Sequence, residues 1–561
     1  MRIYQKWGLT AAMALWVLGV AGQTLPSSVT GRIDSLFRKW DRTSSPGWAV
    51  GIVRNDSLIF AKGYGMANLE YGVPISPETI FHMASVSKQF TAFSIVLLAR
   101  QGKLNLDDDI HKYLPWFPDL KEKITIRNLL THTSGVRDQW QLLAISGTRL
   151  DDVITQDHIV RILSKQRALN FKPGSQYLYC NSGFTMLAEI VRSVTGQTLR
   201  QFTDSAIFRP LGMSHTHFHD NYTEIVPNRS YSYNDEGNGH FSNAVLSYSN
   251  AGATSLFTNI TDMSKWVMNF YAHKVGDQQD IDQLTQRGRL TTGVQLDYAL
   301  GIAVDKFHGQ RRFQHGGADA GYRTFVSVFP DLKMGVIVLC NLADVNSQGK
   351  ADQVASLFIP DTASAKKTGK PPYTDSAAAI LSDPGRIAPF MGAYTSDDGA
   401  RFRFAIEDRK LYWINPSGRY LMVNAGKDEA ELFSDPTVQF VFAVKGSTDT
   451  VTDEYWPGPN HRHLWKYDTT AKPDQQLLTY TGTYYCPELD CRYTIGRKDH
   501  RLMIGNEKYG EQALEILGDN NLRNDWWWMS NLKVLRDGKG TITGFEINDG
   551  RVQHLWFRKE E

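Results

Sequence analysis

Cysteine is scarce in this sequence, which has four in 561 residues: Cys180, Cys340, Cys486 and Cys491. So few thiols exclude a disulfide framework as the basis of the fold. Cys486 and Cys491 are close enough in the chain to close a small loop, and whether they form a disulfide is left open. Two thiols alone do not make a metal site. We expect Cys180 and Cys340 to be ordinary buried thiols.

An excess of charge of either sign is also missing. Lysine and arginine number 61, aspartate and glutamate 59, and the formal net charge is +2. A balance this even, without a long basic run, provides no strong field for nucleic acid or for an anionic membrane surface. We therefore expect neither as a partner.

Long apolar runs are absent except for one near the start of the chain. Residues 9–20 are apolar, follow Arg2 and Lys6, and lead into small residues at 20–22. The run is shorter than the roughly 20 residues that a membrane-spanning helix needs. We therefore predict a signal peptide over residues 1–22 and a periplasmic or secreted chain without a stable membrane span after cleavage. A retained anchor is the alternative.

The length of 561 residues exceeds what one hydrophobic core usually supports, so at least two domains are expected. Residues 28–360 alternate between helical and strand patterns, with strand pairs at both ends and helices between. This order predicts an α+β domain in which helices flank an antiparallel sheet. Residues 361–387 are rich in Ala, Ser, Thr, Lys, Pro and Gly, which is the composition of a linker.

The rest of the chain repeats itself. The triplet G-A-Y at 392–394 recurs as G-T-Y at 482–484, and H-L-W at 463–465 recurs at 554–556. Short strand-like runs replace helical periodicity here. We predict two repeated all-β barrel-like domains, at 388–468 and 477–561. His461 and His463 alternate as metal ligands can, but His463 recurs with its apolar neighbours and is better explained as architecture.

The first chemical signal is the tetrad S-V-S-K at residues 85–88. A serine hydroxyl is a weak nucleophile until a neighbouring group takes its proton. Residues three apart share one face of a helix, so Lys88 can reach the hydroxyl of Ser85. The helix N-terminus also suits an oxyanion that forms beside the serine. Alone the tetrad is weak evidence, because a helix cap followed by a surface lysine explains it equally well.

Two further motifs follow in the chain. Tyr179 in Y-C-N is a candidate proton carrier whose pKa a neighbouring ammonium would lower, and Asn181 offers a donor and an acceptor to a substrate amide. A turn tyrosine and a helix N-cap are the alternatives. In H-G-G at 315–317, Gly316 and Gly317 let the backbone approach a ligand closely, and the next N–H, that of Ala318, is a candidate oxyanion donor.

In this order, the three motifs resemble those of the class C β-lactamase and penicillin-binding-protein group, over about residues 28–360. The resemblance implies that Ser85 attacks a carbonyl while Lys88 and Tyr179 share its proton, and it leaves open which of the two is the base. It further implies that Asn181 and the H-G-G motif bind substrate, that the N–H groups of Ser85 and Ala318 form the oxyanion hole, and that no metal or cofactor takes part.

His315 stands where many of these relatives have lysine. A lysine can hold a substrate carboxylate with a fixed charge, whereas a histidine is charged only near or below about pH 6.5. The pattern is similar to D-aminopeptidases, some DD-peptidases and several esterases. We therefore expect an exported serine hydrolase that acts through an acyl-enzyme on a small-molecule or peptide substrate. It would be a peptidase for D-amino-acid or peptidoglycan-type peptides, or an esterase.

Two other functions stay open: a β-lactamase, and a slow penicillin-binding or sensor protein. The C-terminal repeats resemble the β domains of D-aminopeptidases, which can shape the active-site entrance; a glycan-binding module is the alternative. The run W-W-W at 526–528 fits a ligand platform or, more simply, a barrel core and domain interface. His132 is expected to pin a loop. The oligomeric state is not predicted.

Overall fold

The computed structural model describes residues 25–360 and 379–560, except 382, 397–400, 416–417, 425–428, 435–438, 446–448, 456–460, 468–472 and 519. The predicted signal peptide therefore lies outside the described residues, as do positions 361–378 and 382 of the predicted linker. Among the residues that are described, no helix is long and apolar enough to cross a membrane.

A six-stranded antiparallel sheet forms the centre of the first domain, in the order β12-β13-β14-β15-β1-β2. Val50 and Val338 pair where the start and the end of the domain meet. The predicted α+β fold with an antiparallel sheet is confirmed. The strands are β1 (Trp48–Arg54), β2 (Ser57–Tyr64), β12 (Ala303–Phe307), β13 (Gln310–Asp319), β14 (Tyr322–Phe329) and β15 (Met334–Cys340).

Helices cover both faces of this sheet because its central strands are apolar on both sides. Successive side chains of a strand point to opposite faces. On β15, Val336 and Val338 pack with α1 and α11, whereas Ile337 and Leu339 belong to the core shared with α2 and α9. The helices are α1 (Ser27–Phe37), α2 (Lys88–Arg100), α3 (Ile126–Leu130), α4 (Gln139–Ile145), α5 (Gln156–Leu163), α6 (Asn181–Thr195), α7 (Leu199–Thr203), α8 (Arg209–Leu211), α9 (Ile260–Ala272), α10 (Gln278–Leu284) and α11 (Ser347–Ala355).

Four small sheets complete the domain. One has the order β5-β11-β7 and is antiparallel, and another pairs β10 with β6 in parallel. Strand β5 ends two residues before Ala84, so this small sheet leads directly into the S-V-S-K motif. The strands are β3 (Met66–Asn68), β4 (Val73–Pro74), β5 (Phe81–His82), β6 (Ile154–Thr155), β7 (His217–Phe218), β8 (Tyr233–Gly237), β9 (His240–Asn243), β10 (Tyr248–Ser249) and β11 (Leu256–Thr258).

Two closed eight-stranded antiparallel barrels follow, each preceded by a short helix. They lie within the two predicted repeats, and closure distinguishes them from a sandwich. The first has α12 (Pro384–Ile387), β16 (Gly392–Ser396), β17 (Arg401–Glu407), β18 (Lys410–Asn415), β19 (Gly418–Asn424), β20 (Glu429–Leu432), β21 (Gln439–Lys445), β22 (Asp449–Tyr455) and β23 (His461–Tyr467). The second has α13 (Asp474–Leu478), β24 (Gly482–Cys486), β25 (Cys491–Lys498), β26 (Arg501–Asn506), β27 (Gly510–Ile516), β28 (Asn521–Arg523), β29 (Asn531–Arg536), β30 (Ile542–Asp549) and β31 (Val552–Lys559).

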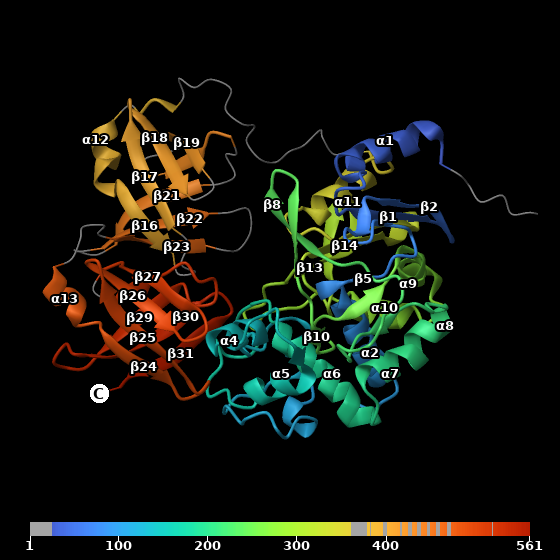
Figure 1. The fold of residues 1–561 in the computed structure, drawn as a ribbon, viewed down its shortest axis with the longest axis horizontal. Helices are drawn as coiled ribbons and strands as arrows, with labels where there is room; N and C mark the ends of the chain where they lie inside the picture. The colour runs from blue at the N-terminus through green and yellow to red at the C-terminus, as the bar shows by residue number, and fades with distance from the viewer. Residues whose placement is uncertain are drawn as a thin grey trace, which may run out of the picture.

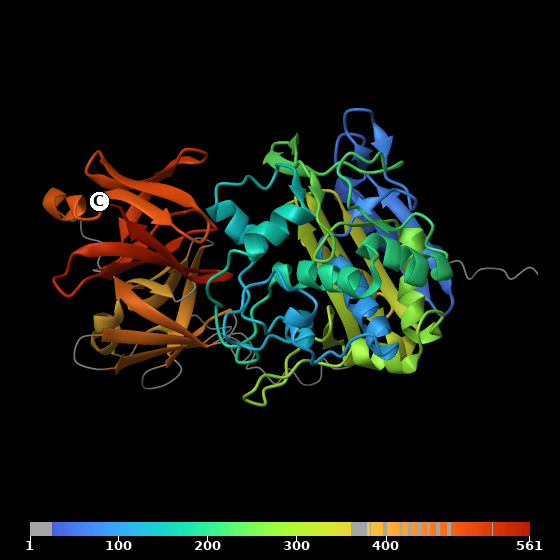
Figure 2. The same ribbon diagram turned by 90° about the horizontal axis from the view of Figure 1, so that it is seen from below.

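The second barrel, red in Figure 1, lies against α4 of the first domain, and Figure 2 shows the same neighbours from below. Leu142 and Ile145 of α4 belong to one apolar cluster with Tyr493 and Trp526 of the barrel. The Tyr493 hydroxyl also donates to the carbonyl of Ile145 at 2.9 Å. Cys486 and Cys491 face each other across the β24–β25 hairpin as free, buried thiols.

Candidate active site

The sequence predicted that Ser85 lies in the first turn of an α-helix. In the structure the segment that carries Ser85 is a tight turn instead. Residues Ala84–Ser87 form a 3-10 turn, and α2 begins only at Lys88. Ala84 has a positive φ of 48°, a strained conformation for a residue with a Cβ. The Ser87 hydroxyl donates to the carbonyl of Ala84 at 2.5 Å and accepts the N–H of Leu256 at 3.0 Å. These bonds fix the turn, so Ser85 is presented in one orientation.

Lys88 lies buried beneath Ser85. Its Nζ is 3.0 Å from the hydroxyl oxygen of Ser85, 2.8 Å from Oδ1 of Asn181 and 2.7 Å from the carbonyl of Ala253. Burial, which disfavours the ammonium form, is the main cause that lowers the pKa of Lys88 to about 7. The group closest to Ser85 therefore changes its charge near neutral pH.

The pKa of Tyr179 differs from the one that the sequence predicted. Its side chain is buried, and this burial raises the pKa of Tyr179 above the ordinary value, against the smaller lowering effects of its hydrogen bond with Ser85 and the charge of Arg551. The Nζ atom of Lys88 lies 4.9 Å from the centroid of the Tyr179 ring. The expectation of a phenolate was wrong because desolvation outweighs the neighbouring charge.

Asn181 begins α6 and is held by an aspartate that sequence reasoning missed. Its backbone N–H and its Nδ2 both donate to Oδ2 of Asp138, at 2.7 and 2.9 Å. This leaves Oδ1 of Asn181 directed at Lys88. The only local signal at Asp138 was that of a helix cap, and its carboxylate does accept the N–H of Trp140. His132 accepts the N–H of Cys180 through Nδ1 at 3.0 Å, as a residue that pins this loop would.

His315 lies within β13, where its ring is buried. Nε2 is 2.8 Å from the hydroxyl of Tyr298, a second residue that the sequence did not single out. Burial, aided by the charge of Lys88, lowers the pKa of His315 to about 3. The imidazole is therefore neutral through the physiological range, so this position carries no fixed positive charge.

Two adjacent glycines have different surroundings. A Cβ on Gly317 would lie 2.3 Å from the carbonyl of Met83, whereas the nearest atom to one on Gly316 would be in the Phe325 ring, at an ordinary contact distance of 3.4 Å. Gly317 thus lets β13 pack directly on the turn that carries Ser85.

Pairing with β12 ends at Gln314, so β13 from His315 onward has one edge without a strand partner among the described residues. A substrate can lie along that edge.

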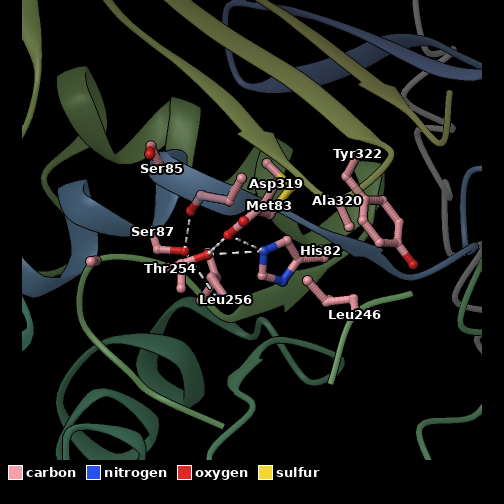
Figure 3. A network of polar contacts seen from close by, with 12 residues as sticks. His82, Met83, Ser85, Ser87, Leu246, Thr254, Leu256, Asp319, Ala320 and Tyr322 are labelled. Carbon is pink, nitrogen blue, oxygen red and sulfur yellow. Dashed lines mark hydrogen bonds and ion pairs between the residues drawn. The ribbon is translucent and has the colours of Figure 1, made fainter. Parts of the chain in front are cut away.

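Asp319 ends β13 in a polar network that Figure 3 displays. Its Oδ2 accepts the Thr254 hydroxyl at 2.6 Å and lies 3.2 Å from Nε2 of His82, which is also 2.9 Å from the Thr254 oxygen. Nδ1 of His82 is buried without a partner among the described residues, so we assign the proton to Nε2. Both neighbours then donate toward Oδ2, and Oδ1 of Asp319 has no partner in the described part of the chain.

A cleft of about 920 Å³ brings these groups together. The predicted site residues that line it are Ser85, Tyr179, Asn181, His315, Gly316, Gly317 and Ala318, with Lys88 below Ser85. Their catalytic roles stay predictions. Asp138 and Asp319 line the same cleft.

The second barrel supplies part of the cleft wall: Trp527, Gly550 and Arg551. The turn between β30 and β31 is fastened by Asn170, whose Nδ2 donates to the carbonyl of Arg551 at 2.9 Å, and by Gln141, whose Oε1 accepts its N–H at 2.8 Å. In the W-W-W run Trp526 is buried, whereas Trp527 is 54% exposed. Trp528 packs against the same core cluster as Trp526, so core packing leaves only Trp527 of this run unexplained.

Comparisons with known proteins show which family the chain resembles. The family model described as Beta-lactamase matches residues 33–358. A D-aminopeptidase of Gluconobacter oxydans is 24% identical over 488 residues, which cover 86% of this chain and 86% of that protein. A D-aminopeptidase of Brucella anthropi is 28% identical over 318 residues, 55% of this chain and 58% of that protein.

Among solved structures, the octameric penicillin-binding protein homologue from Pyrococcus abyssi aligns with a TM-score of 0.54 at 20% identity. The alignment covers 78% of this chain and 99% of that chain, and it shows a shared fold. The family match spans more than half of the sequence and contains every motif of the cleft. The chain belongs to the β-lactamase family and is a serine hydrolase of the β-lactamase/transpeptidase superfamily.

Proposed function

We propose that this protein is an exported hydrolase that releases an N-terminal D-amino acid from amides and short peptides through an acyl-enzyme on Ser85. The observation that carries the proposal is the distribution of charge along β13. The D-aminopeptidase relatives support the choice of substrate class, and the predicted signal peptide supports export to the periplasm or medium.

Side chains at 315, 317 and 319 share one face of β13 because they are two residues apart. A Cβ on Gly317 would point at Met83 and Ala84, so this face of β13 is turned toward the segment that carries the nucleophile. His315 and Asp319 then flank Ser85, each about 7 Å along the strand from Gly317. When the substrate carbonyl lies at Ser85, one half of the substrate extends toward His315 and the other half toward Asp319.

The two ends differ in charge. A lysine in the third motif can hold a substrate carboxylate, but the neutral His315 has no charge for that purpose. Asp319, with two donors on Oδ2 and no partner for Oδ1 among the described residues, offers a carboxylate to a cation. The positive charge nearest to Asp319 along the chain is that of Arg323, and its guanidinium already donates to the carbonyls of Ala320 and Tyr322. This arrangement favours a substrate with a free α-ammonium over one that ends in a carboxylate.

The surroundings of Lys88 suit a general base. As a neutral amine it has two N–H groups, for which Asn181 Oδ1 and the carbonyl of Ala253 are the acceptors. Its lone pair then faces the hydroxyl of Ser85, whose proton it takes as the oxygen attacks the substrate carbonyl. The N–H groups of Ser85 and Ala318 stabilise the oxyanion. Tyr179, kept protonated by its raised pKa, gives its proton to the leaving amine as the C–N bond breaks and takes the proton held by Lys88 in its place. Lys88, neutral again, accepts a proton from the water molecule that attacks the ester, and the proton returns to Ser85 as the acid is released.

A hydrolysis panel tests the proposal. The purified protein and the Ser85→Ala variant are assayed with D-alanyl p-nitroanilide, its L enantiomer, a p-nitrophenyl ester and nitrocefin. We expect turnover of the D compound and of the ester, both lost in Ser85→Ala. Fast turnover of nitrocefin with none of the D-anilide identifies a β-lactamase instead. Stoichiometric acylation without product release identifies a slow penicillin-binding or sensor protein.

A further inference from the structure

Two histidines and a glutamate converge outside the cleft, near strand β7. His217 and His219 are two residues apart, so they leave an extended chain on the same side. One possible ligand atom from each of His217, His219 and Glu224 lies within 4.8 Å of the others. Nδ1 of His219 is 3.7 Å from Oε2 of Glu224.

These imidazoles have buried nitrogens with nothing to bind. His219 is 2% exposed, and neither of its ring nitrogens has a hydrogen-bond partner among the described residues; Nε2 of His217 is in the same situation. Buried polar atoms in folded proteins are nearly always paired, so an unpaired group requires an explanation such as a bound ion or water. Three in one place, beside a carboxylate, point to a shared ligand.

Two carboxylates and two arginines surround the three donors. Both oxygens of Glu224 accept from Arg200, at 2.5 and 2.8 Å, and Arg200 also reaches Asp220 at 3.1 Å. A carboxylate that binds a metal is commonly hydrogen-bonded in this way, and it has lone pairs to spare. Arg229, whose guanidinium lies 5.0 Å from the centroid of the Phe257 ring, is a second cation nearby. Glu224 and Asp220 together balance the two arginines.

We propose that His217, His219 and Glu224 bind one divalent transition-metal ion, for which Zn²⁺ is the best fit. Two imidazole nitrogens and one carboxylate oxygen are an established donor set for zinc and its neighbours. Zinc bonds of about 2.0–2.2 Å put ligand atoms of a tetrahedral site about 3.4 Å apart. The three donor atoms, which lie within 4.8 Å of one another, would have to close to that spacing around the ion.

The ion would brace the small sheet that leads to the nucleophile. His217 pairs with Phe257 on β11, and Phe257 pairs with His82 on β5. His82 is three residues from Ser85 and belongs to the Asp319 network. The role assigned to the metal is therefore structural, which departs from the sequence-based expectation that the protein has no metal site.

Metal titration of the full chain tests this proposal. The protein is treated with EDTA, dialysed, and titrated with ZnCl₂ by calorimetry, while bound zinc is counted by mass spectrometry and the melting temperature is followed. We expect one equivalent of zinc more than in His219→Gln or His217→Ala, and a melting temperature that rises with zinc in the wild type but not in these two variants. His500→Ala, which removes a histidine 83% exposed on the second barrel, serves as the matched control and should bind zinc as the wild type does.

Far-UV circular dichroism and a cooperative thermal transition verify that each variant has folded. Zinc binding by the wild type no greater than that of His219→Gln overturns the proposal. So does an equivalent of zinc that persists when His217 and His219 are both replaced. Neither result bears on Ser85, so the proposed hydrolase activity stands or falls separately.

Discussion

The guanidinium of Arg551, at the tip of the β30–β31 turn, lies 4.9 Å from the centroid of the Tyr179 ring. Arg551 belongs to the second barrel and Tyr179 to the hydrolase domain, so both domains contribute to the cleft. Arg551 also lies 3.9 Å from the carboxylate of Asp138, which holds Asn181. Its positive charge opposes the rise in the pKa of Tyr179 that burial causes.

Replacing Arg551 with methionine should therefore raise the pKa of Tyr179 further and slow the release of poor leaving groups. We expect kcat for an anilide to fall about tenfold, the effect of about one pKa unit, with a smaller fall for a p-nitrophenyl ester. The turn itself should stay docked, because Asn170 and Gln141 hold its backbone. Arg558→Met, which removes another ring-stacked arginine on β31, is the control. Equal rates for Arg551→Met and Arg558→Met would contradict the assignment.

The contact between the domains contains a buried ion pair. Nη1 of Arg137 donates to both oxygens of Glu488 at 2.7 Å, and the side chains are 1% and 7% exposed. Glu488→Ala leaves the guanidinium buried without its counter-ion, which typically costs about 3–5 kcal/mol. We expect a lower denaturation midpoint in urea and loss of activity. Glu560→Ala removes a more exposed partner, that of Arg492, and should cost at most about 1 kcal/mol. Similar losses in the two variants would contradict this account.

The pH dependence of the reaction follows from Lys88. The base must be unprotonated, so kcat/KM for an uncharged ester should rise as the pH rises through about 7 and level off above it. The raised pKa of Tyr179 keeps its acid form beyond the ordinary range, so no fall is expected before about pH 10. A stopped assay over this range measures the profile. A rise centred near pH 10 would show that the base has the ordinary pKa of a lysine or a tyrosine, and would contradict the lowered pKa of Lys88.

The two glycines of the third motif should respond differently to alanine. In Gly317→Ala the new Cβ forces β13 away from Met83, and a misplacement of about 1 Å can cost 10²-fold in rate. Gly316→Ala has room and should stay within a few-fold of the wild type. Acylation of Ser85 by a fluorophosphonate probe measures both. Equal labelling rates would show that the strand does not depend on this close approach.

Sequence motifs predicted the residues that meet in the cleft because each motif is a local pattern with its own chemistry. The α+β sheet and the repeated β domains also followed from periodicity and internal repetition. Asp138 and Tyr298 could not be predicted in this way, since one looks like a helix cap and the other has no motif. Only the tertiary fold brings them to Asn181 and His315.

The charge states of the site were also beyond the sequence. Neighbouring residue types suggested an ammonium that lowers the pKa of Tyr179. Burial instead raises the pKa of Tyr179 and lowers that of Lys88 to about 7. The distance in sequence between Tyr179 and Arg551 likewise hides their contact. Desolvation and long-range contacts depend on the packed structure.

The most direct test of the central claim is a comparison of D-alanyl p-nitroanilide with its N-acetyl derivative, in the wild type and in Asp319→Asn. The account predicts that the wild type strongly prefers the free amine, and that Asp319→Asn loses at least about tenfold in kcat/KM on that substrate, as expected for a lost charge-assisted contact. Activity on the acetylated compound should hardly change. A wild type that cleaves the acetylated compound equally well, or a preference that Asp319→Asn leaves intact, would contradict it.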